Sequence, residues 1–146
     1  LLENDKFLIL RTPNIYGLYG TKKFKRNTLL PFSLCNQIIE ENKIVLNSNG
    51  QQVKNFISIK SILYFINQNN FRNNIINLAG KDNLTIIYYA NKIKKIYEKI
   101  TSSKSKIYNN KKDKKIYKNH KYESVYFNSK FDNLDLFIES YLRLKI

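Results

Sequence analysis

Apolar positions near the start of the chain fall in one short run, which polar and glycine-containing residues follow. Residues 7–10 read Phe-Leu-Ile-Leu, a continuous apolar run typical of a buried strand. The Thr-Pro-Asn sequence at 12–14 predicts a turn, because proline lacks a backbone donor and restricts the residue before it. Gly17 and Gly20 mark a loop that we expect to extend to about Arg26.

Helical spacing of apolar residues first occurs after this loop. Thr28 is the predicted cap of a helix that ends near residues 41–42, and Pro31 is tolerated in its first turn. The apolar positions that define the stripe are Leu30, Leu34, Ile38 and Ile39.

A strand pair and a second helix are predicted next. Residues 44–46 and 53–57 have the composition of short strands, and the Asn-Ser-Asn-Gly sequence at 47–50 has turn chemistry. Ser58 is the predicted cap of the helix that follows, which we expect to end in the polar run 67–70.

The second half of the chain predicts one buried strand and two helices. The strand covers 75–79 and is broken by Gly80. Thr85 is the predicted cap of a helix over 84–100 with a continuous apolar stripe, and a last helix covers about 133–144.

Residues 101–121 are rich in lysine and asparagine and contain two isolated apolar pairs, at 107–108 and 116–117. This pattern predicts a solvated excursion with one or two short edge strands. Outside it, strands alternate with helices, so the chain is predicted to be a single α/β unit over 1–146 with largely parallel pairing. We expect 7–10 and 75–78 to be neighbouring parallel strands.

The formal net charge of +15 is the most unusual feature of the composition. A basic surface can indicate nucleic-acid binding, but nearly all the positive residues are lysine, with only four scattered arginines to read base edges. The chain is equally biased toward Asn, Ile, Tyr and Phe, which favours background coding composition as the origin of the charge. No nucleic-acid partner is therefore expected.

Candidate chemistry outside the motifs is sparse. Cys35 lies in an apolar segment and is predicted to be a buried thiol, and His120 has no cysteine or second histidine near it for a zinc site. No apolar run is long enough for a membrane span, so we expect a cytoplasmic protein without a membrane partner. The chain contains no methionine, which predicts that it is truncated.

Three motifs occur in a recognisable order. Residues 9–17 read ILRTPNIYG, residues 44–62 read IVLNSNGQQVKNFISIKSI, and residues 76–85 read INLAGKDNLT. In this order and spacing they resemble the extended short-chain dehydrogenase/reductase family, the NAD-dependent nucleotide-sugar epimerases and dehydratases. The resemblance covers roughly residues 7–100. It implies late strands of a Rossmann-type parallel sheet and the small C-terminal substrate-binding lobe of such an enzyme.

Three positions of the second motif depart from the family pattern. Ser48 stands where the family has glycine, Lys54 where it has arginine and Ser61 where it has aspartate. Lysine keeps a cation for a phosphate but loses the bidentate fork of arginine. Serine at position 61 removes a carboxylate at the start of a helix.

The resemblance also implies which residues bind ligands. Asn14 would reach the pyrophosphate of a nucleotide-diphosphate sugar, Lys54 would supply a cation to it, and Tyr16 would line the sugar pocket. Arg11 more simply anchors the end of its strand. The full set of implied contacts is Thr12 and Pro13 beside the cofactor, and Asn14, Tyr16, Thr28, Leu29 and Lys54 at the substrate. Each also has a structural reading, as a turn, cap, packing or solvated surface residue.

Two motifs of the family are missing. The four glycines form no Gly-rich dinucleotide fingerprint, and the Tyr-x-x-x-Lys pairs at 88–92 and 108–112 follow the first motif, whereas the family pair precedes it. No catalytic residue is therefore assigned, and NAD or NADP would be held mainly by a missing N-terminal half. The isolated chain is expected to be inactive, and the complete protein to be a homodimer. The alternative is a non-catalytic basic module that binds RNA or another polyanion.

Overall fold

The computed structural model describes residues 7–18, 28–68, 74–110, 112–118, 121–124 and 129–146. The predicted loop beyond residue 18 and His120 lie outside this range. Strands and helices follow one another in the order β1 (Leu8–Arg11), β2 (Asn14–Tyr16), α1 (Leu30–Glu41), β3 (Lys43–Leu46), β4 (Val53–Ser58), α2 (Ile59–Gln68), β5 (Asn74–Asn77), β6 (Asp82–Thr85), α3 (Ile86–Thr101), β7 (Lys106–Asn109) and α4 (Leu134–Lys145).

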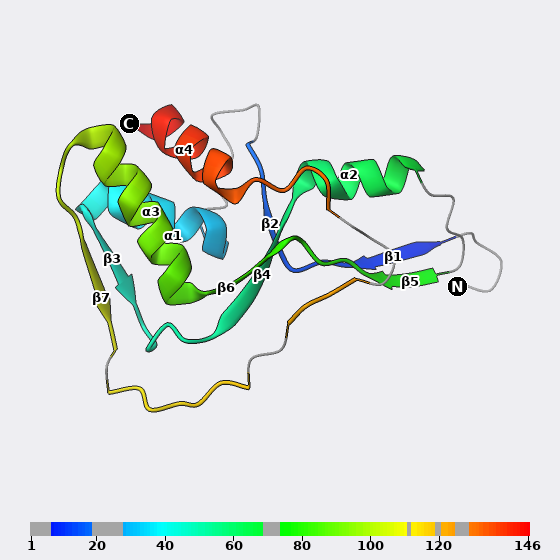
Figure 1. Cartoon of the computed structure of the whole chain (residues 1–146), viewed down its shortest axis with the longest axis horizontal. Helices are drawn as coiled ribbons and strands as arrows, with labels where there is room; N and C mark the ends of the chain where they lie inside the picture. The colour runs from blue at the N-terminus through cyan, green and yellow to red at the C-terminus, as the bar shows by residue number, and fades with distance from the viewer. Residues whose placement is uncertain (1–6, 19–27, 69–73, 111, 119–120, 125–128) are drawn as a thin grey trace.

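The strands form three small groups. β1 pairs in parallel with β5, in a register that places Leu8 beside Asn74 and Arg11 beside Asn77, so the predicted parallel neighbours are confirmed. β4 is the central strand of the second group, parallel to β2 and antiparallel to β6. β3 pairs in parallel with β7. Figure 1 shows β1 and β5 at one end of the molecule, and α1, α3 and α4 gathered at the other.

β4 separates two apolar cores. Phe56 belongs to the larger core, which α1, α3 and α4 build with β2 and β3. Ile57, the next residue, belongs to the smaller core between α2 and the β1–β5 pair. Successive side chains of a strand point to opposite faces, so this one strand contributes to both cores. The larger core contains Cys35, which is fully buried as predicted, and burial raises the pKa of its thiol to about 12.

Helix starts agree with the predicted caps in two cases and differ in one. The Ser58 hydroxyl accepts from the Ser61 backbone N–H at 3.0 Å, and the Thr85 hydroxyl accepts from that of Tyr88 at 3.2 Å. The Thr28 cap is wrong, because α1 begins one residue later, with Leu29 at the cap position and no side-chain cap bond. Pro31 lies in the first turn of α1, where its missing N–H costs nothing.

Several short elements differ from the sequence prediction. Asn14 begins strand β2 instead of completing a turn, because pairing with β4 satisfies its backbone. β6 was not predicted, and it takes residues 84–85 from the start of the predicted helix. The strand predicted for 75–79 ends at Asn77. The prediction of one or two edge strands in 101–121 agrees with the structure, in which 106–109 forms β7, whereas 116–117 is not a strand and Ile116 is 93% exposed.

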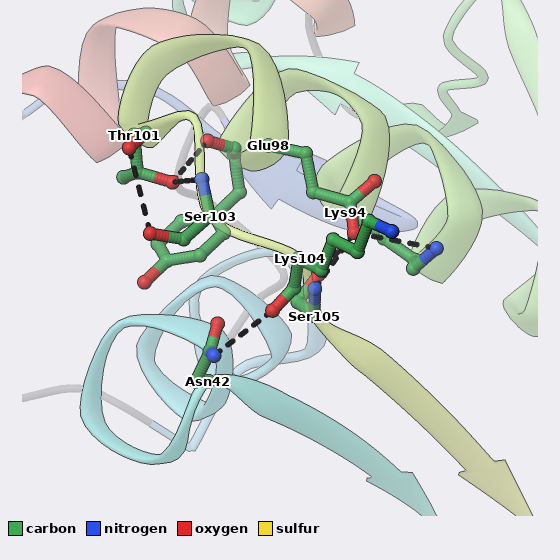
Figure 2. Close-up of polar contacts among 8 residues, drawn as sticks. Asn42, Lys94, Glu98, Thr101, Ser103, Lys104 and Ser105 are labelled. Atoms are coloured by element: carbon green, nitrogen blue, oxygen red, sulfur yellow. Dashed lines mark hydrogen bonds and ion pairs between the residues drawn. The ribbon is translucent and has the colours of Figure 1, made fainter.

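A polar network fixes the turn from α3 to β7, as Figure 2 shows. The Glu98 carboxylate accepts from the backbone N–H of Ser105 at 2.7 Å and from its hydroxyl at 3.2 Å. The Asn42 amide donates to the Lys104 carbonyl at 3.0 Å. Because Asn42 directly precedes β3, these contacts hold the start of β7 beside β3.

Within the described residues, no helix is long and apolar enough to cross a membrane. The same part of the chain holds no group of histidine, cysteine and acidic side chains suited to a metal ion.

Candidate functional site

Three of the predicted substrate residues lie on one face of the β2–β4 pair. The register places Asn14 beside Phe56 and Tyr16 beside Ser58. Lys54 is two residues before Phe56 and therefore shares its face. From strand spacing and rise, the Cα atoms of Asn14 and Lys54 are about 8 Å apart. Phe56, which lies on this face beside Asn14, is fully buried in the larger core, whereas Asn14 and Lys54 are half-buried.

Asn14 is held in place by the neighbouring strand. Its side-chain nitrogen donates to the Asn55 carbonyl at 3.0 Å. A carboxamide nitrogen carries two hydrogens, so this bond orients the side chain and leaves a second hydrogen that can donate to an anion.

Tyr16 ends β2 in an aromatic cluster. It is 3% exposed, and its ring centroid lies 5.1 Å from that of Phe137 on α4. Its hydroxyl lies near the Asn133 backbone at the start of α4 without a well-formed hydrogen bond. Burial raises the pKa of this hydroxyl, the negative charges of Asp132 and Asp82 raise it further, and the contact with the Asn133 backbone lowers it by less. Tyr16 is therefore a neutral phenol over the physiological pH range.

A pocket of about 290 Å³ opens where β2 and β4 end. Tyr16 and Gly17 form one wall, Ser58 and Ile59 a second, and the start of α4 a third. A side chain on Gly17 would approach the Ile59 methyl group to 2.5 Å, so glycine keeps this wall open. The pocket adjoins the face that carries Asn14 and Lys54.

The loop between β5 and β6 is fixed by Asn55, a residue that the sequence did not single out. Asn55 is 1% exposed, accepts from the Gly80 N–H at 2.7 Å and donates to the Gly80 carbonyl at 2.9 Å. A Cβ atom on Gly80 would lie 1.8 Å from the Phe56 carbonyl oxygen, so only glycine fits. A polar residue at an inward position of an apolar strand was the available signal for Asn55.

Asp132 is the second residue that the sequence did not single out. Its carboxylate accepts from the Ser58 N–H at 2.9 Å, the Ser61 hydroxyl at 2.8 Å and the Lys81 N–H at 2.9 Å. Burial opposes its ionisation, but these bonds and one from Ser129 outweigh that cost and lower its pKa. Ser61 carries no carboxylate of its own, and Asp132 supplies one to the start of α2 from a distant part of the chain.

The remaining predicted residues lie around this face. Thr28 and Leu29 are exposed before α1, whose Phe32 ring stands edge-on to Phe137 at 5.4 Å, so this helix start adjoins the aromatic cluster of Tyr16. Thr12 and Pro13 link β1 to β2.

The positions of Thr12 and Pro13 bear on the cofactor prediction. They follow the carboxyl end of β1, the side on which open α/β sheets bind ligands. Thr12 is exposed and Pro13 is half-buried. No Gly-rich cradle for its pyrophosphate occurs in the sequence.

Comparison with protein-family models and with curated proteins finds no match to this sequence. Comparison of structures finds clear similarity. UDP-glucose 4-epimerase from Thermotoga maritima, in complex with UDP-glucose, superimposes with a TM-score of 0.67 at 13% identity, over 95% of this chain and 47% of that one. UDP-N-acetylglucosamine 4-epimerase from Bacillus cereus gives 0.67 at 17% identity, over 94% and 47%.

An NAD-dependent NDP-hexosamine 5,6-dehydratase of tunicamycin biosynthesis gives a TM-score of 0.60 at 15% identity, over 92% of this chain and 44% of that one. The chain thus spans about half the length of these structures, and it matches their C-terminal part. The predicted fold class, late strands of a Rossmann-type sheet with the C-terminal lobe, is confirmed. This chain has the fold of the C-terminal part of the NAD-dependent nucleotide-sugar epimerases and dehydratases, the extended short-chain dehydrogenase/reductases.

Proposed function

We propose that this chain is the substrate-side part of an NAD-dependent nucleotide-sugar epimerase, dehydratase or reductase, and that it binds the diphosphate of a nucleotide sugar. The observation that carries the proposal is the shared face of Asn14, Lys54 and Tyr16 beside a pocket, in a chain with this fold. Asn14 and Lys54 would contact the diphosphate, and Tyr16 would border the sugar. Thr28 and Leu29, at the start of α1, would contact the nucleotide.

Lys54 determines how well the diphosphate is oriented. An ammonium is a compact point charge, whereas a guanidinium binds two phosphate oxygens through a planar fork. With lysine here, the charge is kept and the angular preference is lost. The orientation of the diphosphate then depends more on the Asn14 amide, which is fixed by its hydrogen bond to the Asn55 carbonyl.

The redox chemistry would come from NAD or NADP, which takes a hydride from a sugar carbon when bound. Thr12 and Pro13 would line the nicotinamide end of the pocket. The remaining part of the enzyme would hold most of the cofactor and carry the catalytic acid and base. The complete protein is proposed to be a homodimer. A cytoplasmic location is proposed because a buried, unpaired Cys35 suits a reducing compartment.

The β1–β5 pair supports association with a larger sheet. Ile9 and Ile75 are register partners, and they are 43% and 53% exposed on the face opposite the small core. Parallel sheets are normally covered on both faces. A further layer from the rest of such an enzyme would cover these two side chains.

Calorimetric titration with UDP-glucose tests the proposal, in the 146-residue chain and in the complete enzyme. Asn14→Ala and Lys54→Ala should each weaken binding about ten- to a hundredfold, the cost of one charge-assisted contact of roughly 1.5–3 kcal/mol. NAD affinity of the complete enzyme should change little. Lys54→Arg should bind as well or better, because it restores the fork.

Lys95→Ala is the matched control, since it removes the same charge from an exposed position on α3. Single-stranded RNA serves as the competing ligand. The proposal would be contradicted, in favour of a polyanion binder, by tight and salt-dependent RNA binding with two properties. Its affinity would be unchanged in Asn14→Ala, and it would be lost when the lysines between 104 and 121 are replaced.

A further inference from the structure

The carboxylate of Asp132 joins three segments that are far apart in the sequence. One oxygen accepts from the Ser58 N–H at the end of β4 and from the Ser61 hydroxyl in the first turn of α2. The other oxygen accepts from the Lys81 N–H in the loop between β5 and β6. Asp132 itself directly precedes Asn133, the cap of α4.

At α2 these contacts complete a capping box from outside the helix. In a capping box, the cap hydroxyl accepts from the third helical N–H, and the third side chain accepts from the cap N–H. Ser58 and Ser61 make the first bond, at 3.0 Å. The second acceptor is Asp132, 71 residues from Ser61, and the fully buried Ser61 hydroxyl donates to it.

The same contacts set two walls of the pocket beside Tyr16. Ser58 lines one wall, while Phe131 and Asn133, the sequence neighbours of Asp132, line another. Asp132 is not itself a lining residue. Its carboxylate therefore shapes the pocket walls through the segments that it joins, and its charge also raises the pKa of the Tyr16 hydroxyl.

We propose that Asp132 is a positioning residue for this pocket: it ties the start of α4 to the β4–α2 corner and to the β5–β6 loop, and so sets the distance between the pocket walls. The assignment of a sugar to the pocket rests on the proposed function. The positioning role of Asp132 does not depend on the proposed function.

Moving the carboxylate from position 132 to position 61 distinguishes positioning of the pocket walls from simple capping of α2. Ser61→Asp with Asp132→Ser moves the carboxylate to the third position of α2, where it can cap Ser58 but holds neither α4 nor Lys81. Amide hydrogen exchange of the full chain should show Asp132→Ser speeding exchange at Ser58 and Lys81 by about ten- to a hundredfold. The Phe137 amide, which bonds the Asn133 carbonyl, should also exchange faster. In the double variant, the exchange rate should return to the wild-type value at Ser58 only.

UDP-glucose titration supplies the second readout. Asp132→Ser should weaken binding, and the double variant should stay weak. Asp135→Ser is the matched control, since it removes a nearby exposed carboxylate paired with Lys92 and should change neither readout. Unchanged exchange rates at Ser58 and Lys81 in Asp132→Ser would overturn the positioning role. A return of the Lys81 and Phe137 exchange rates to wild-type values in the double variant would also overturn it. A wild-type chain that shows the exchange pattern but binds no UDP-glucose would refute the proposed function and leave the tie standing.

Discussion

Replacing Gly80 with alanine should be among the most damaging single changes in the described chain. The added Cβ atom would lie 1.8 Å from the Phe56 carbonyl oxygen and 2.7 Å from an Asp132 carboxylate oxygen. A normal carbon–oxygen contact is roughly 3.3 Å. The loop and β4 must therefore separate by about 1.5 Å, a movement of backbone against backbone that no rotamer change can absorb.

The cost follows from what that movement breaks. Asn55 bonds Gly80 at 2.7 and 2.9 Å and is 1% exposed, so no water can replace the lost partners. Two hydrogen bonds at about 1 kcal/mol each, plus about 1–3 kcal/mol for a buried amide without partners, give roughly 3–5 kcal/mol. A domain is stable by only about 5–15 kcal/mol, so much of the stability would be lost.

Urea unfolding followed by circular dichroism measures this loss. Gly17→Ala is the control, since its Cβ would meet the Cγ2 methyl of Ile59, a 38% exposed side chain that can move by rotation about χ1 rather than by backbone movement. That variant should lose only about 1–2 kcal/mol. A Gly80→Ala chain whose free energy of unfolding lies within about 1 kcal/mol of the wild-type value would refute the reasoning on the Asn55–Gly80 contact.

Three further outcomes are expected. The isolated chain should reduce no NAD with any nucleotide sugar, as absorbance at the NADH wavelength would show; turnover would contradict the assignment of catalysis to another part of the enzyme. Cys35 should not react with a thiol reagent in the folded chain, because burial raises its pKa to about 12, and should react on unfolding in urea. Asp132 has a lowered pKa in the folded chain, so its stabilising contribution is present above the unfolded value of about 4 and is lost as pH falls below it. Asp132→Asn should therefore flatten the acid limb of the stability curve, and an unchanged limb would argue against the contribution.

Local signals in the sequence were sufficient for most helices and for one sheet pair. Ser58 and Thr85 cap the helices that they were predicted to cap, because capping depends on a side chain and a backbone group three residues apart. The apolar run at 7–10 and its partner at 75–78 pair in parallel as expected. The three motifs predicted the Rossmann-type fold through their resemblance to the extended short-chain dehydrogenase/reductases.

The sequence by itself thus determined where most elements begin and which face of each is apolar. Only the tertiary structure decided the rest. β2 and β6 are too short and polar to show a period of their own, and both exist because β4 lies between them. Asn55 meets Gly80 across 25 residues, and Asp132 meets Ser61 across 71. No local spacing encodes such contacts, since they form only when packing of the two cores brings β4, the β5–β6 loop and the start of α4 together.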